Sequence, residues 1–190
     1  MASYVCFDLE TTGFSPKRAD IVEIAAKAFN YDGEKCEHVS SFQTLVSPEG
    51  ENHAAAVKIH GITDAMLRGK PRMEEVWPEF LRWIQTHARN DFVFVGHNIV
   101  KFDLPFLRAK TDNHLLCSSQ NVFDTYLVAK DIYHTASNRK LTTLYKHVLK
   151  EGAKMQAHRA MGDVEMNVVL ACAELDRLKL GGLEASNYYV

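Results

Sequence analysis

The hydrophobic positions of this chain change their spacing about a third of the way along it. Apolar residues first come in short runs bounded by turn-forming residues, a pattern typical of β-strands. Further on they recur every three or four positions, which is the period of an amphipathic helix. The expected strands cover residues 4–7, 21–29, 38–46, 92–96 and 122–123, and the expected helices cover 73–84, 104–109, a segment from 124, 141–148 and 164–178.

The order of these elements predicts the fold class. Three strands come first, and Asp32-Gly33 between the second and the third indicates a hairpin. Helices and strands then alternate, which favours an α/β fold with a mixed sheet covered by helices. The 190 residues suit one domain, which we expect to cover residues 1–180, with 181–190 as a short C-terminal tail.

Composition excludes several classes of protein. Hydrophobic residues make up 46% and charged residues 24%, as in ordinary soluble globular proteins. No apolar run approaches the length of a membrane span, so we expect no membrane partner. Asp8 and Glu10 come too early to leave room for the core of a signal peptide, and the four cysteines are widely spaced. We therefore expect reduced thiols and a cytoplasmic protein, with the nucleus left open.

Charge is distributed unevenly. The formal net charge of −2 argues against a broad basic coat for nucleic acid. Residues 1–64 nevertheless hold ten acidic and five basic residues, whereas residues 139–159 hold six basic and one acidic residue. The basic stretch has two interpretations that remain open: a solvated helix face, or a surface that binds a phosphate backbone.

The first chemical cluster is Asp8-x-Glu10 at the end of the first strand. Residues two apart on a strand point to the same face, so the two carboxylates lie side by side. Their mutual repulsion raises the pKa of one of them unless a cation is present. Either they bind a divalent metal, or they lie in water beyond the edge of the sheet.

The second cluster consists of His97, Asn98 and Asp103 and follows the strand at 92–96. Open α/β folds place their binding sites at the carboxyl ends of strands. Asp103 has an alternative interpretation as a helix N-cap, because it precedes Pro105 by two residues. The sequence leaves both interpretations open.

The third cluster, His158 and Asp163, opens the last helix. Taken alone, Asp163 complements a helix dipole and His158 is an exposed histidine. With Asp8, Glu10 and Asp103 they form a larger set: four carboxylates, which Mg²⁺ prefers as ligands, and one histidine. Such a set suits phosphodiester hydrolysis with two metal ions and a histidine that accepts the proton of water.

Three segments closely resemble the motifs of the DEDDh 3′→5′ exonucleases, a family that includes the proofreading subunit of bacterial DNA polymerase III and the three-prime repair exonucleases. They are FDLETTG (7–13), GHNIVKFDLPFL (96–107) and HRAMGDV (158–164). IHGITDAML (59–67) and FDTYLVAK (123–130) are similar to secondary segments of that family. The resemblance implies an RNase H-like fold: a five-stranded mixed sheet flanked by helices, with the second strand antiparallel to the others.

The resemblance also implies two divalent cations, Mg²⁺ or Mn²⁺. By motif position, Asp8, Glu10 and Asp163 bind the more tightly held ion. Asp8 bridges to the second ion, and Asp103 acts there largely through water. His158 occupies the position of the general base.

Contacts with substrate are implied in the same way. Thr11 meets the terminal nucleotide, and Phe14 and His60 flank its base. Asn98 and Phe102 contact the penultimate nucleotide or its phosphate. Packing in the core remains an alternative for Phe14 and Phe102.

Two neighbouring side chains are expected to support the structure. His97 is interpreted as a support for its loop, and Asp124 as a helix N-cap. A pairing of Asp124 with Arg159 is an open alternative.

The implied activity is 3′→5′ release of nucleoside 5′-monophosphates from single-stranded 3′ ends. DNA is favoured over RNA, because the turn at residues 10–13 resembles the proofreading type and lacks the methionine of oligoribonucleases. The alternatives are an RNA-trimming exoribonuclease, a polymerase-associated proofreading subunit and a non-catalytic nucleic-acid-binding module. The presence of all four carboxylates and the histidine argues against the last. The sequence does not decide between a polymerase partner, a homodimer and neither.

Overall fold

The computed structural model describes residues 1–111, 121–149 and 159–190. The strands are β1 (Ala2–Thr11), β2 (Ile21–Tyr31), β3 (Cys36–Leu45), β4 (Val93–Gly96) and β5 (Val122–Asp124). The helices are α1 (Ala54–His60), α2 (Asp64–Leu67), α3 (Met73–His87), α4 (Asp103–Lys110), α5 (Thr125–Ile132), α6 (Leu141–Leu149), α7 (Ala160–Leu180) and the short 3-10 helix η1 (Ala185–Tyr188).

The five strands of the described residues form one mixed sheet in the order β3-β2-β1-β4-β5. β2 runs antiparallel to both of its neighbours, whereas β4 runs parallel to β1 and β5 parallel to β4. The predicted α/β class, the five-stranded mixed sheet and the antiparallel second strand are therefore confirmed. β1, β4 and β5 run in the same direction, so their carboxyl ends lie together. The first two predicted motifs lie at the carboxyl ends of β1 and β4.

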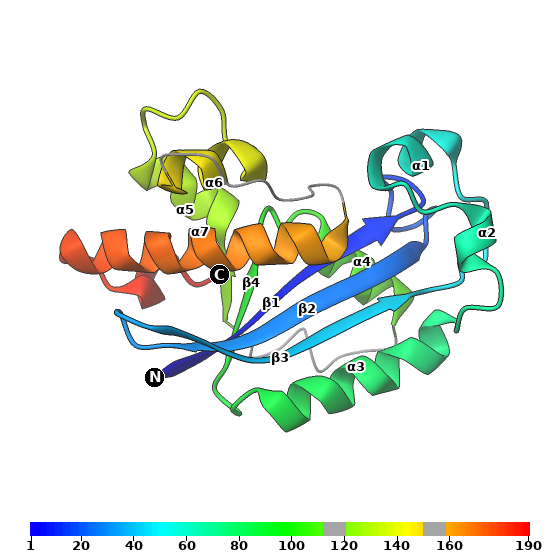
Figure 1. Ribbon diagram of the computed structural model, residues 1–190, viewed down its shortest axis with the longest axis horizontal. Helices are drawn as coiled ribbons and strands as arrows, with labels where there is room; N and C mark the ends of the chain where they lie inside the picture. Colours follow the sequence, from blue (N-terminus) through cyan, green and yellow to red (C-terminus); the bar gives the residue numbers. More distant parts are fainter. Residues whose placement is uncertain (112–120, 150–158) are drawn as a thin grey trace.

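Helices cover both faces of the sheet (Figure 1), with α7 crossing one face and α3 lying along the other. The alternation of side chains along β1 decides which residues meet each helix. Val5, Phe7 and Leu9 pack in the cluster that includes α3. Tyr4 and Cys6 pack in the cluster that includes α7. Asp8 and Glu10 continue the second series, so they lie on the α7 face.

Two short helices were not predicted. α1 has seven residues and α2 has four, and each buries one side chain, so neither produces a periodic apolar pattern. α1 lies beside the end of β1 (Figure 1), and Leu67 of α2 packs with Val22 of β2.

The last residues of the chain return to the sheet. Tyr189 forms an antiparallel bridge with Phe123, and Val190 exchanges backbone hydrogen bonds with Val122. This segment covers the outer edge of β5, which otherwise presents unpaired backbone groups. Nowhere in the described ranges is there a helix long and apolar enough to cross a membrane.

Candidate active site

Three carboxylates meet where the end of β1 lies under the beginning of α7. Asp8 and Glu10 come from β1, and Asp163 comes from the first turn of α7. One carboxylate oxygen from each lies within 4.8 Å of the others. The structure therefore brings Asp163 to Asp8 and Glu10, which precede it by more than 150 positions in the sequence.

A β-bulge separates Glu10 from Thr11. Glu10 pairs with Glu23 on β2, but Thr11 pairs with Ile21, so β2 has one extra residue at this point. Such bulges bend a strand and redirect side chains, and they are frequent beside active sites. Here β1 bends into a turn in which the Thr11 hydroxyl donates a 2.7 Å hydrogen bond to the carbonyl of Gly13.

The fourth carboxylate, Asp103, is buried with 3% of its surface exposed. It is the first residue of α4, and the N-cap position belongs to Phe102, so the interpretation of Asp103 as a cap is wrong. Its Oδ1 accepts a 3.0 Å hydrogen bond from the backbone N–H of Leu9, between Asp8 and Glu10. This bond holds the second motif against the first.

The electrostatics of the four acids favour a cation. Burial, and then the nearby charges of Asp163 and Glu23, raise the pKa of Glu10 to about 8. Burial likewise raises the pKa of Asp103 to about 7. The pKa of Asp8 is raised well above its ordinary value by burial and then by Asp103 and Asp163. Crowded carboxylate oxygens of this kind are the donors that Mg²⁺ and Mn²⁺ prefer, so the side chains fit such ions.

A further acid beside the cluster, Glu23, is fully buried and was not predicted to belong to the site. It binds Arg159 through two hydrogen bonds, Nη2 to Oε1 at 2.7 Å and Nε to Oε2 at 3.1 Å. Burial alone would raise the pKa of Glu23, but the bonds from Arg159 and Gln43 outweigh it and hold that pKa below its ordinary value. The available sequence signal was a single acid inside an otherwise apolar strand.

The loop after β4 is held by Asp124 and His97. Asp124 caps α5 as predicted and also accepts hydrogen bonds from the backbone N–H groups of Asn98 (2.9 Å) and Val100 (3.2 Å). The alternative pairing of Asp124 with Arg159 is wrong, because Arg159 binds Glu23. Asn98 has a φ of 65°, a left-handed conformation that asparagine tolerates.

His97 supports its loop, as expected. Its Nδ1 lies 2.9 Å from the Thr125 hydroxyl and its Nε2 lies 2.8 Å from the carbonyl oxygen of Arg139. Burial lowers the pKa of His97 and so favours the neutral ring. His97 thereby fastens the segment that carries Arg139 to the end of β4.

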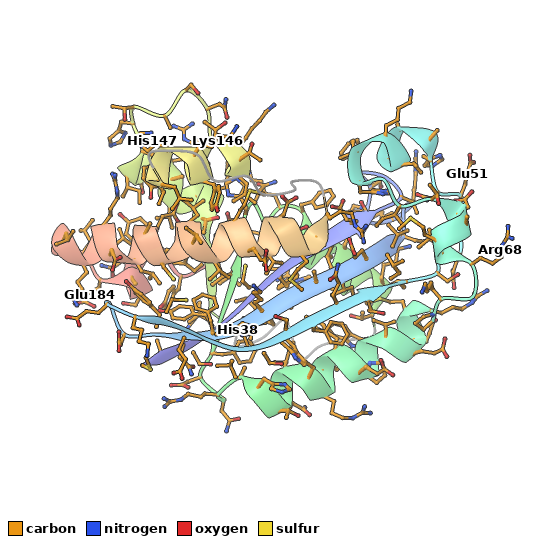
Figure 2. All side chains as sticks on the ribbon, in the orientation of Figure 1. His38, Glu51, Arg68, Lys146, His147 and Glu184 are labelled. Carbon is orange, nitrogen blue, oxygen red and sulfur yellow. The ribbon has the colours of Figure 1, made fainter. Side chains whose placement is uncertain are left out.

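An open cavity of about 750 Å³ lies over the four carboxylates. Its lining combines the acids with aromatic, amide and basic side chains: Asp8, Leu9, Glu10, Ile59, His97, Asn98, Lys101, Phe102, Asp103, Tyr126, Asn138, Arg139, Lys140 and Asp163. Among the described residues of the basic stretch, Arg139 and Lys140 at its beginning line this cavity. Lys146 lies on α6 beside His147 (Figure 2) and outside this lining.

A smaller cavity of about 330 Å³ adjoins the first, and Glu10 and Ile59 line both. The predicted contacts Thr11, Phe14 and His60 line the smaller one. Phe14 is 80% exposed, so its alternative interpretation as a core residue is wrong.

Phe102 and His158 complete the predicted set. Phe102 is half-buried, lines the larger cavity and has its ring centroid 5.1 Å from that of Phe106, so it both packs and faces the site. His158 lies outside the described residues. The described chain resumes at Arg159, which is the N-cap of α7.

Comparison with known proteins agrees with the fold. The sequence model of the exonuclease family (RNase_T) matches residues 5–171. The chain belongs to this exonuclease family.

A curated relative is the PolC-type DNA polymerase III of Caldanaerobacter subterraneus subsp. tengcongensis. It is 30% identical over 182 residues, which cover 96% of this chain but only 12% of that polymerase. Two solved structures share the fold. Exonuclease X in complex with 5′-overhanging duplex DNA has a TM-score of 0.69 and 24% identity, with 97% of this chain and 96% of that chain covered. The nuclease domain of 3′hExo, a DEDDh family member bound to rAMP, has a TM-score of 0.74 and 16% identity, with 96% and 94% covered.

Proposed function

We propose that this chain removes nucleotides one at a time from single-stranded 3′ ends and releases nucleoside 5′-monophosphates. The observation that carries the proposal is the convergence of the Asp8, Glu10 and Asp163 carboxylates within 4.8 Å, in one cavity with Asp103. We assign this activity to residues 1–180, and residues 181–190 follow as a short segment whose last two residues pair with β5.

The proposed chemistry uses two divalent cations, Mg²⁺ or Mn²⁺, held by Asp8, Glu10, Asp103 and Asp163. Such ions, when bound, stabilise the negative charge on the leaving oxygen and lower the pKa of an attacking water. His158 precedes the turn of Arg159 and Asp163 in the chain, and we assign it the acceptance of the proton of water.

The two cavities suggest how substrate binds. Phe14, exposed beside His60, offers a flat surface for the terminal base, and stacking of this kind tolerates every base. Lys101, Arg139 and Lys140 line the larger cavity and are available for backbone phosphates. In this arrangement the 3′ end lies at the carboxylates and the strand leaves across Asn98 and Phe102.

We propose DNA as the preferred substrate. The family relative with polymerase in its name and the duplex DNA in the Exonuclease X structure support this choice. The rAMP bound to the 3′hExo nuclease domain supports the alternative, an exoribonuclease. The PolC-type relative also supports association with a polymerase, which would make this chain a proofreading subunit.

The deciding experiment is digestion of matched single-stranded DNA and RNA oligonucleotides with Mg²⁺, with Mn²⁺ and with EDTA. A 5′ label should give a ladder with single-nucleotide steps, and a 3′ label should be released as mononucleotide. Faster digestion of RNA would replace the DNA proposal with the exoribonuclease, and internal cuts would contradict an exonuclease.

Two further measurements test the chemistry and the partner. His158→Ala should lower the rate by roughly 10²–10⁴-fold near neutral pH, because a general base contributes about that much. An unchanged pH–rate profile in this variant would contradict the assignment of His158. A rate that rises only when a replicative polymerase is added would favour the proofreading subunit.

A further inference from the structure

Glu23 and Arg159 form an ion pair that no step of the proposed reaction uses. The Glu23 side chain is fully buried in the sheet, and Arg159 grips both of its oxygens in a bidentate arrangement. The same carboxylate accepts hydrogen bonds from Gln43 Nε2 (2.9 Å) and from the backbone N–H of Ala160 (3.2 Å). Each of the two Glu23 carboxylate oxygens therefore accepts two hydrogen bonds.

The pair joins the two elements that carry the carboxylate cluster. Glu23 lies directly opposite Glu10 in the register of β2 and β1. Arg159 is the N-cap of α7 and Ala160 is its first residue, so Glu23 holds the start of this helix by a side chain and by the backbone. The N–H of Asp163 closes the same turn on the Arg159 carbonyl at 3.1 Å.

Stability alone does not account for such a pair. A buried ion pair loses much of its Coulombic gain to desolvation, and apolar replacements of similar size are often neutral or stabilising. The geometry, by contrast, has a clear consequence. Glu23 is fixed opposite Glu10 and is hydrogen-bonded to the turn that carries Asp163. It therefore sets the distance between Glu10 and Asp163.

We propose that Glu23 and Arg159 are positioning residues: they anchor the first turn of α7 on β2 and so hold Asp163 in register with Glu10. The inference rests on the proposed function for its catalytic consequence, although neither residue lines the cavity over the carboxylates. An error of about 1 Å in such a site costs up to about 100-fold in rate.

The chain supplies a matched control. Lys27 and Glu165 also join β2 to α7, through a 2.7 Å salt bridge, but their side chains are 23% and 42% exposed. Lys27 follows Glu23 by four residues on β2 and lies opposite Cys6 of β1, and Glu165 follows Arg159 by six residues on α7. A pair of this kind tests whether any ion pair between β2 and α7 suffices, or only the one beside Glu10.

The experiment compares Glu23→Gln, Arg159→Gln, Arg159→Lys and the double variant Glu23→Gln/Arg159→Gln with Lys27→Met/Glu165→Gln. Activity is measured at saturating substrate and over a range of Mg²⁺ concentrations, and thermal unfolding is recorded for each. Binding of Mn²⁺ is measured separately without substrate, by electron paramagnetic resonance.

The single Gln variants should lower kcat by about 10–100-fold with little change in KM, and should weaken Mn²⁺ binding about tenfold. The double variant should be no worse than the singles, because the two side chains act as one unit. Arg159→Lys should fail to restore kcat, since lysine lacks the planar fork. The control pair should change kcat by about twofold at most, as exposed pairs do.

Wild-type kcat and Mn²⁺ affinity in Arg159→Gln, even with a lower unfolding temperature, would overturn the inference and leave a purely structural pair. Arg159 is partly exposed, so this variant keeps the test valid if Glu23→Gln does not fold. An inactive wild-type protein would instead refute the proposed function. The Mn²⁺ affinities of the variants would then test by themselves whether Glu23 and Arg159 position the carboxylates.

Discussion

The backbone N–H of Leu9 donates a 3.0 Å hydrogen bond to Oδ1 of Asp103. β4 pairs with β1 only from Tyr4 to Cys6, so the end of β1 has no strand partner on that side. The Asp103 carboxylate takes the place of the missing strand while it also lines the cavity over the cluster. One side chain thus completes the sheet and contributes charge to the site, and two substitutions can separate these contributions.

Asp103→Asn should abolish most activity and leave the fold stable, because the amide oxygen still accepts from Leu9. We expect a loss of at least about 100-fold in kcat, since the charge that supports a metal ion is gone. Asp103→Ala should be less stable than Asp103→Asn by about 1–3 kcal/mol, the cost of a buried unpaired N–H group. Urea denaturation in EDTA measures this difference, and equal stabilities would show that the Leu9 bond contributes nothing.

The metal-free protein should become less stable as the pH rises. In the folded state the pKa of Glu10 is about 8 and that of Asp103 about 7, raised in both cases chiefly by burial. The unfolded chain releases these protons near pH 4, so between about pH 4 and pH 8 the folded state binds more protons and stability falls. Unfolding temperatures in EDTA at about pH 5 and about pH 8 test the direction, and a rise would contradict it.

Divalent cations should reverse this pH effect, and Asp8 should be required for the reversal. Mg²⁺ or Mn²⁺ at about 100 times the dissociation constant adds about 2.7 kcal/mol to the unfolding free energy, which calorimetry detects readily. Asp8→Asn should lose both this gain and the nuclease activity. It should also raise the stability of the metal-free protein at neutral pH, because it relieves repulsion with Asp103 and Asp163. Wild-type rates in Asp8→Asn would refute the assignment of the site.

Much of this architecture could be predicted from local pattern. The apolar runs and their bounding turns located all five strands, because buried strands have a strong compositional signature. The spacing of Asp8 and Glu10 placed both on one face of β1, which depends only on the pleat of a strand. The resemblance of three motifs then identified the segments that meet: the ends of β1 and β4 and the beginning of α7.

Other features depend on tertiary contacts that no local pattern records. Glu23 read as an interruption of a strand, and only the packing of α7 on β2 shows that it binds Arg159. Asp103 resembled a helix cap because the donor that it binds, the backbone N–H of Leu9, is 94 residues away in the chain. The position of Arg139 at the cavity likewise depends on the hydrogen bond between His97 and the Arg139 carbonyl, which joins residues far apart in the chain.

Glu174 should destabilise the protein at alkaline pH. It is fully buried on α7, and neither of its carboxylate oxygens has a hydrogen-bond partner in the part of the chain that the structure describes. Burial, and then Asp124, raise its pKa well above the ordinary value, so ionisation is costly. Glu174→Met should therefore add about 1–3 kcal/mol to the unfolding free energy at about pH 8, and less at about pH 5. Equal gains at the two pH values, measured by urea denaturation, would contradict ionisation as the cause.

The basic residues should differ in how they affect substrate binding. Arg139 and Lys140 line the cavity over the carboxylates, whereas Lys146 lies outside its lining on α6. A contact with one phosphate of a single strand contributes about 0.7 to the slope of log affinity against log salt concentration. Arg139→Ala and Lys140→Ala should each reduce the salt slope of kcat/KM by about that amount, and Lys146→Ala should leave it unchanged. The measurement is hydrolysis of one DNA oligonucleotide over a series of KCl concentrations. If Lys146→Ala has the same effect as Arg139→Ala, the substrate follows α6 and the cavity does not define its path. If none of the three variants changes the slope, these three residues belong to an ordinary solvated surface.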